Sequence, residues 1–214
     1  MGTEPGGALG SSTGAPGRAC TPIDAGASNR HDPAGQDGRM PLRHASAPTP
    51  LGIATAVLTD TGLGMLHFGD GDPEYVLERA ALAWRTPLTH DEASLTPVFM
   101  QLDEYFAGER RDFDIPLDLS QTHGFVRAAL ETICTIAYGE TASYGEVAVR
   151  AGAPGAARAV GSACARTPIS VVVPAHRVVR ADGSIGEYGG DPETKRFLLD
   201  LEVHALTLAA QAER

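Results

Sequence analysis

The spacing of apolar and polar residues along the chain changes several times and marks out two structural units. Residues 52–68 consist of two apolar runs on either side of a short Gly-containing turn, a pattern typical of a β-hairpin. Pro73 opens a stretch with apolar residues three and four positions apart, and Thr96-Pro97 opens a second such stretch. We therefore expect residues 49–120 to form a small α/β domain with a hairpin and helices.

The next part of the chain predicts three short helices in succession. An apolar stripe covers residues 125–136, and Ser143 with Glu146 fits a capping box that opens a second helix. A Gly-containing turn then leads into residues 156–163. Two short helices across such a turn resemble a helix-turn-helix, although ordinary helix pairs show the same pattern.

After these helices the pattern changes again. A continuous apolar run, Ile169–Val173, predicts a buried strand, and residues 194–202 predict an amphipathic helix. Residues 121–214 are therefore expected to form a mostly helical domain with a helix-turn-helix of winged-helix-like type. The fold class expected for the whole chain is α+β.

The first 48 residues differ from the rest. Residues 1–48 consist mostly of Gly, Pro, Ala, Ser, Thr and Asp, with few large aliphatic side chains. Such a segment buries too little apolar surface to offset the entropy cost of ordering. We expect a disordered tail over 1–48, with a partner-binding tail as the alternative.

Charge is distributed unevenly along the chain. The 17 Lys and Arg residues against 27 Asp and Glu residues give a net charge of −10. Residues 60–118 carry four arginines against thirteen acids, whereas residues 140–180 carry five arginines against two acids. A polyanion could therefore dock on the second region despite the overall charge.

Cysteine and histidine usage argues against disulfide or metal scaffolds. Cys20, Cys134 and Cys164 are far apart in the sequence, and the seven histidines show no metal-ligand spacing. We expect no metal and no cofactor. No apolar run is long enough for a membrane span, so a cytoplasmic protein without a membrane partner is the expectation.

The helix expected at 156–163 has almost no large side chains apart from Arg158. A smooth helix can approach another backbone closely, and a single arginine on it could enter a groove or fill the space of an extruded base. Close packing in a core, with Arg158 only solvated, explains the same composition.

Five motifs in this order give the chain a specific resemblance: SYGEVA, GAARAVG, PISVVVPAHRVV, GEYGG and KRFLLDLE. They resemble the DNA-binding and active-site domain of the O6-alkylguanine-DNA alkyltransferases, the methylated-DNA–protein-cysteine methyltransferases. The match covers nearly all of residues 121–202. The hairpin and the LDEYFAGERRDFDIPLDL stretch resemble the N-terminal domain of the same family.

The resemblance implies that a helix-turn-helix binds the minor groove of double-stranded DNA and flips out an O6-alkylguanine. It also implies roles for individual residues: Arg158 replaces the flipped nucleotide, Tyr144 helps to turn it out, and the Val178 backbone recognises guanine. Tyr188 and the Gly189 backbone would form the pocket wall. The small residues of the DNA-contacting helix would be Ala156, Ala157, Gly161 and Ser162.

The family reaction needs a cysteine in a PCHRV loop that accepts the alkyl group once, with a His–Glu pair that removes the thiol proton through water. By motif, His176 and Glu202 match that pair, but the acceptor position is Ala175. A thiolate is a strong nucleophile near neutral pH, whereas alanine has no group to deprotonate. We therefore expect no methyl transfer.

Thr167 is a second departure from the family pattern. It stands before Pro168, where the family usually has an asparagine that braces the loop by hydrogen bonds. A threonine can replace only part of that bracing. Cys134 and Cys164 lie away from the expected strand tip and are expected to be small packing residues, not substitute nucleophiles.

Three functional hypotheses remain open from the sequence. The first is a monomeric DNA-repair protein that binds O6-alkylguanine in the bacterial cytoplasm without repairing it, and flags the lesion for a downstream repair protein. The second is a suicidal methyltransferase in which Ala175 replaces the native cysteine. The third is an inactive family member redeployed as a protein-binding module through its acidic N-terminal unit.

Overall fold

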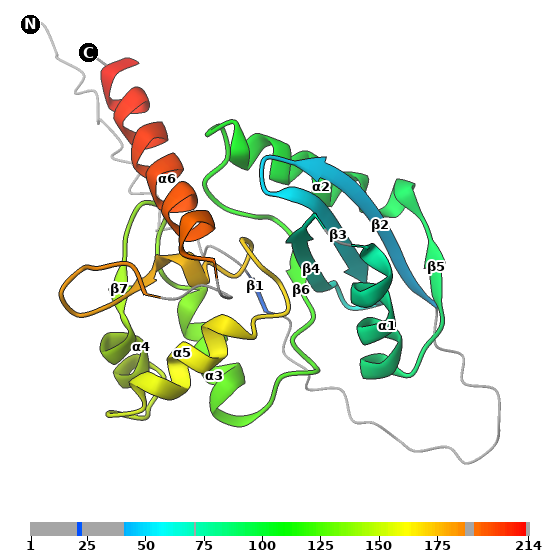
Figure 1. Cartoon of the computed structure of the whole chain (residues 1–214), viewed down its shortest axis with the longest axis horizontal. Helices are drawn as coiled ribbons and strands as arrows, with labels where there is room; N and C mark the ends of the chain where they lie inside the picture. The colour runs from blue at the N-terminus through cyan, green and yellow to red at the C-terminus, as the bar shows by residue number, and fades with distance from the viewer. Residues whose placement is uncertain (1–20, 23–40, 71, 187–190, 213–214) are drawn as a thin grey trace, which may run out of the picture.

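The computed structural model describes residues 21–22, 41–70, 72–186 and 191–212. They form a sheet unit with two helices and a helical unit whose last helix, α6, projects away from the rest (Figure 1). This arrangement is the α+β class expected from the sequence.

Within the described residues the main sheet has the strand order β1-β6-β4-β3-β2-β5. Its strands are β1 (Thr21–Pro22), β2 (Leu42–Thr49), β3 (Gly52–Leu58), β4 (Leu63–Gly69), β5 (Leu88–His90) and β6 (Pro116–Leu117). The β3–β4 pair is antiparallel, which confirms the predicted hairpin. The pairs of β1 with β6, of β6 with β4 and of β2 with β5 are parallel.

All but the last residue of strand β2 lies in the segment that the sequence predicted to be disordered, so the prediction of a tail over 1–48 is wrong for residues 42–48. The short strand β1 also falls in that segment. Strand β2 pairs with β3 from Arg43↔Leu58 to Thr49↔Gly52 and with β5 on its other side. Strand β2 is ordered because it pairs with these two strands, since β2 itself contains few large apolar side chains.

Two helices accompany the sheet, α1 (Pro73–Trp84) and α2 (Glu92–Phe106). Helix α1 has the predicted start, but α2 begins several residues before the predicted Thr96-Pro97. Asp91 caps α2 by accepting hydrogen bonds from the Ser94 backbone N–H at 3.1 Å and from the Ser94 hydroxyl at 2.6 Å. This side-chain cap starts the helix upstream and leaves Pro97 inside it.

The two helices pack on opposite faces of the sheet. Ala54 and Ala56 of β3 belong to a core with the buried residues of α2, whereas Val57 belongs to a second core with Val76 and Ala80 of α1. Alternate residues of a strand point to opposite faces, which accounts for this separation. The α2-side core continues into the helical unit, so the two units share one apolar core.

The helical unit is built around three predicted helices and one long C-terminal helix. Its elements are α3 (Gly124–Ile133), β7 (Ala142–Ser143), α4 (Tyr144–Arg150), α5 (Ala157–Ala165), the 3-10 helix η1 (Ala175–Arg177), β8 (Val178–Val179) and α6 (Pro192–Ala212). The predicted capping box between Ser143 and Glu146 is present at the start of α4. Helix α6 is longer than predicted. Across the described residues, no helix combines the length and apolar character that a bilayer crossing requires.

The apolar run Ile169–Val173 is not the strand that the sequence predicted. It forms isolated bridges and a turn, with Val171 at a φ of 69°. Leu66 of β4 pairs with this segment, since its N–H donates to Pro168 O at 2.8 Å and its carbonyl accepts from Ser170 N–H at 3.0 Å. The positive φ of a β-branched residue is costly, and the fully buried surroundings hold the turn in place.

Candidate functional site

The best-defined polar cluster of the helical unit is centred on the Glu202 carboxylate of α6. Its Oε1 accepts hydrogen bonds from His176 Nε2 at 2.8 Å and from the Tyr105 hydroxyl at 2.8 Å. The Arg177 guanidinium donates to the same carboxylate at 2.9–3.1 Å, and Gly139 N–H donates to Oε2 at 2.8 Å. The structure thus brings together the predicted pair His176 and Glu202.

Three different parts of the fold supply this cluster. Tyr105 comes from α2 of the sheet unit, His176 and Arg177 come from η1, and Glu202 comes from α6. All four side chains are buried. Arg177 Nη1 also donates to Ile136 O at 2.7 Å, which fixes the guanidinium against the end of α3.

The charges of the cluster follow from its contacts. Burial alone would raise the pKa of Glu202, but the hydrogen bonds and charges of His176 and Arg177 outweigh it and lower the pKa to about 2. Burial lowers the pKa of His176 below its usual value, although the bond to Glu202 opposes this. Burial and the neighbouring carboxylate raise the pKa of Tyr105 well above its usual value. Glu202 is therefore ionised and His176 neutral near pH 7.

These protonation states fix the tautomer of the imidazole. An ionised Glu202 can only accept, so the proton of neutral His176 resides on Nε2. The Nδ1 atom then carries a lone pair and can take up a proton, as a general base does. The residue before His176 is Ala175, which is fully buried in η1 and offers no atom that could lose a proton to it.

Tyr144 lies in a second cluster, together with glycines and the only lysine of the chain. Lys195 Nζ is 5.6 Å from the centroid of the Tyr144 ring and also donates a hydrogen bond to Val178 O. A Cβ built on Gly186 would lie 2.4 Å from Tyr144 Oη, whereas one on Gly161 would lie 3.8 Å from the ring. Lys195 therefore connects the predicted residues Tyr144 and Val178, and the predicted residue Gly161 lies beside the same tyrosine ring.

Helix α5 presents a smooth outer surface with one long side chain near its start. Arg158 is exposed, and no carboxylate of the described residues forms a salt bridge with it. Ala157 opens the helix, Ala156 precedes it as the N-cap residue, and Ser162 is exposed on the same helix. Val160, Ala163 and Cys164 form the buried side. The close-packing interpretation therefore describes one face of α5, while Arg158 lies on the open face.

The predicted bracing role of Thr167 has no counterpart in the hydrogen bonds of its hydroxyl. Thr167 Oγ1 is buried and has no hydrogen-bond partner among the described residues. Two further predicted residues, Tyr188 and Gly189, lie outside the described residues.

The two cysteines of the helical unit are unsuited to nucleophilic attack. Cys164 is buried on α5, and burial raises the pKa of its thiol to about 11. Cys134 is buried and disulfide-bonded, which corrects its interpretation as a plain packing residue.

Sequence reasoning missed three residues of these clusters: Tyr105, Arg177 and Lys195. Tyr105 belongs to the apolar spacing that follows Thr96-Pro97, and Arg177 is one of the five arginines counted in residues 140–180, so neither was singled out as a site residue. Lys195 carries one detectable signal, because a single lysine inside an amphipathic helix of an otherwise arginine-based chain is unusual. The position of Lys195 in the sequence does not reveal that its side chain is completely buried.

Two family models match the chain. The model for the ribonuclease-like domain of 6-O-methylguanine DNA methyltransferase matches residues 42–119, and that for the DNA-binding domain matches residues 124–204. Curated relatives include the methylated-DNA–protein-cysteine methyltransferase of Mycolicibacterium paratuberculosis, 43% identical over 75% of this chain and 92% of that protein. The corresponding protein of Methanosarcina acetivorans is 45% identical over 75% of this chain and 98% of its own length.

Solved structures agree with these relatives. Mycobacterium tuberculosis OGT in complex with DNA superposes with a TM-score of 0.66 and 38% identity, over 76% of this chain and 94% of that chain. The O6-methylguanine methyltransferase of the same organism gives a TM-score of 0.65 at 38% identity, over 78% of this chain and 98% of that chain. The chain therefore belongs to the 6-O-methylguanine DNA methyltransferase family of DNA-repair proteins.

Proposed function

We propose that this protein binds O6-alkylguanine in duplex DNA, holds the flipped base in the helical unit, and leaves the alkyl group on the base. The observation that carries the proposal is Ala175 in the PAHR segment, next to His176 of the Glu202 cluster. Alkyl transfer to protein requires a thiolate at the place where the base enters. Ala175 supplies only a methyl group there.

The other thiols do not replace the missing acceptor. Cys164 has a pKa raised to about 11, so almost none of it is thiolate near pH 7. Cys134 is disulfide-bonded. The described residues contain no further cysteine.

The features that serve binding are retained. The pair α4 and α5 forms the helix-turn-helix, with Arg158 exposed and without a carboxylate partner on α5. An arginine in this position can occupy the space that an extruded nucleotide leaves, and the small residues around it allow a close approach to the minor groove. The M. tuberculosis relative was solved in complex with DNA, which supports DNA as the partner.

Tyr144 and the residues near it are suited to hold the flipped base. The Tyr144 ring packs close to Gly186 and Gly161, and Lys195 fixes the Val178 carbonyl beside it. A carbonyl oxygen has a second lone pair, so Val178 can still accept a hydrogen bond from guanine. We assign the protein to the bacterial cytoplasm as a monomer that marks lesions for a downstream repair protein.

A salt-controlled anisotropy titration tests the proposal. A duplex with one O6-methylguanine is compared with the same duplex carrying guanine, at two or more salt concentrations because phosphate contacts weaken with salt. The lesion duplex should bind more tightly. Arg158→Ala should reduce that preference by roughly tenfold, as expected for about 1–3 kcal/mol of lost readout. Arg111→Ala, which removes a charge from the sheet unit, serves as the control.

Each other outcome of the titration contradicts the proposal. Equal affinity for the two duplexes would show general DNA binding without recognition of the lesion. No binding to either duplex, even at low salt, would favour the third hypothesis, in which the acidic sheet unit binds a protein.

A second candidate function is a methyl acceptor whose native cysteine has been replaced by Ala175. The hydrogen-bonded His176–Glu202 pair favours it, because that pair keeps the geometry of a proton acceptor without a thiol to serve. Restoring a cysteine at position 175 separates this candidate from the first, as described in the Discussion.

A further inference from the structure

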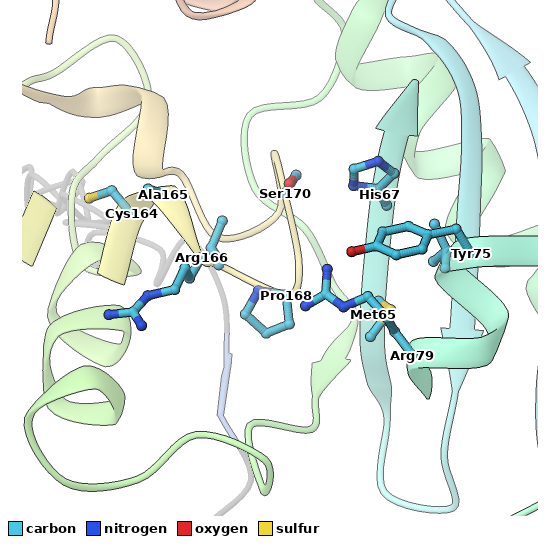
Figure 2. Close-up of a pocket in the computed structure, with 11 residues that line it drawn as sticks. Met65, His67, Tyr75, Arg79, Cys164, Ala165, Arg166, Pro168 and Ser170 are labelled. Atoms are coloured by element: carbon cyan, nitrogen blue, oxygen red, sulfur yellow. The ribbon is translucent and has the colours of Figure 1, made fainter. Parts of the chain in front are cut away.

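A pocket with a volume of about 260 Å³ opens between the sheet unit and the helical unit (Figure 2). Its first wall comes from β4 and α1, and its second from the end of α5 and the following residues 165–170. Neither Ala175 nor His176 lines this pocket. The pocket is therefore separate from the Glu202 cluster.

Arg79 of α1 gives the pocket its positive charge. No carboxylate of the described residues forms a salt bridge with Arg79, although residues 60–118 contain thirteen acids. The guanidinium lies 5.8 Å from the centroid of the Tyr75 ring. In Figure 2 the Arg79 guanidinium and the Tyr75 hydroxyl both point into the space beside Pro168. An uncompensated guanidinium in this position is suited to bind an oxyanion.

The opposite wall adds hydroxyl donors. Thr167 lines the pocket, and its hydroxyl Oγ1 is buried without a hydrogen-bond partner among the described residues. Ser170 lies across the pocket from His67 (Figure 2). A buried hydroxyl without a partner costs free energy, and a bound acceptor would remove that cost.

Arg166 also lines the pocket but does not act as its cation. Its Nε donates to Ser162 O at 3.2 Å, and Figure 2 shows its guanidinium turned away from Arg79. The oxyanion position is therefore defined by Arg79, Tyr75 and the two hydroxyls, with the imidazole of His67 on the same side.

The pocket also has an apolar part that an inorganic ion would leave unfilled. Met65, Val76 and Pro168 line it. Its volume lies just below the range of roughly 300–1,000 Å³ that is usual for drug-sized ligands, so the ligand must be small.

We propose that this pocket binds the phosphate monoester of a small organic molecule. Arg79, Tyr75, Thr167 and Ser170 together offer more donors than the two oxygens of a carboxylate require, whereas a phosphate offers three terminal oxygens. The organic part packs against Met65, Val76 and Pro168. Because the two walls belong to different units, the bound ester connects the sheet unit to the helical unit.

The test is a protein-observed NMR titration of the full chain with phenyl phosphate, with inorganic phosphate and phenol as separate arms. Phenyl phosphate should bind more tightly than either of the others, with shifts at residues 65–79 and 165–170. Arg79→Gln should weaken its binding by about tenfold or more, the loss expected for a hydrogen-bonded charge. Arg111→Gln, which removes one charge outside the pocket, should leave the affinity within about twofold.

Thr167→Val provides a second variant, since it removes the unpartnered hydroxyl and keeps the side-chain shape. It should also weaken phenyl phosphate binding. Equal affinity of Arg79→Gln and the unsubstituted chain would overturn the proposal, as would shifts confined to α4 and α5. If inorganic phosphate bound as tightly as phenyl phosphate, the claim that the ligand carries an organic group would be wrong.

Discussion

The Tyr105 hydroxyl of α2 donates a 2.8 Å hydrogen bond to Glu202 Oε1 of α6, across the boundary between the sheet unit and the helical unit. The two residues are 97 positions apart in the chain, and both are buried. The sheet unit thus provides one of the donors that hold the carboxylate next to His176. The position of the Glu202 carboxylate therefore depends on the sheet unit as well as on the helical unit.

Tyr105→Phe removes that donor and leaves the aromatic ring in place. We expect the free energy of unfolding to fall by about 2 kcal/mol, because the bond is made to a buried charge. Urea denaturation measures the change. Tyr75→Phe is the matched control, since the Tyr75 side chain is 64% exposed and its loss of a hydroxyl should change stability by less than about 0.5 kcal/mol. Equal stability of the two variants would mean that the Tyr105 bond contributes nothing.

The low pKa of Glu202 makes stability dependent on acid. Its folded-state pKa is about 2, against an ordinary value of 4.5, so the folded state binds this proton less readily than the unfolded chain. The stabilisation is complete above pH 4.5 and is lost as the pH falls towards 2. Denaturation curves at several pH values should show this loss, and Glu202→Gln should have a shallower dependence over the same window. A Glu202 carboxyl titrating near 4.5 by NMR would contradict the expectation.

Two glycines on either side of Tyr144 should respond differently to alanine. A Cβ on Gly186 would lie 2.4 Å from Tyr144 Oη, so the ring must move, and we expect a loss of about 1–3 kcal/mol. A Cβ on Gly161 would lie 3.8 Å from the ring, which is ordinary contact. Gly161→Ala within helix α5 should therefore raise stability by up to about 1 kcal/mol. Thermal unfolding that ranked the two variants in the reverse order would refute this packing around Tyr144.

Thr167→Val should stabilise the protein in the absence of ligand. The Thr167 hydroxyl is buried without a partner among the described residues, so an isosteric apolar side chain avoids its desolvation cost. We expect a gain of about 1 kcal/mol in the free energy of unfolding. Thr132→Val is the comparison, since the Thr132 hydroxyl donates to Ala128 O at 2.8 Å and its removal should not stabilise. A destabilised Thr167→Val would show that the hydroxyl braces the loop after all.

The parts of the fold that the sequence predicted correctly depend on local signals. The β3–β4 hairpin, the capping box of Ser143 and Glu146, and the short helices α4 and α5 all follow from residues close together in the chain. Strand β2 does not, because its order depends on pairing with β3 and β5. The Ile169–Val173 run was misinterpreted because a fully buried turn and a buried strand are equally apolar.

The candidate site was predictable only in part for a similar reason. His176 and Glu202 were identified by their motifs, and the structure joins them at 2.8 Å. Tyr105 and Lys195 were missed, because their roles depend on which polar atoms the tertiary fold buries beside them. The spacing of residues along a helix does not reveal a hydrogen-bond partner that belongs to another unit of the fold.

The absence of alkyl transfer is tested most directly by the intact mass of the protein after incubation with a duplex that carries one O6-methylguanine. Ala175→Cys, analysed in parallel, is the matched comparison. We predict that the unsubstituted chain keeps its mass while the lesion remains in the recovered DNA, because Ala175 has no nucleophilic atom. Ala175→Cys should gain one methyl group if the His176–Glu202 pair still accepts a proton. A stoichiometric methyl gain on the unsubstituted chain would contradict the central claim.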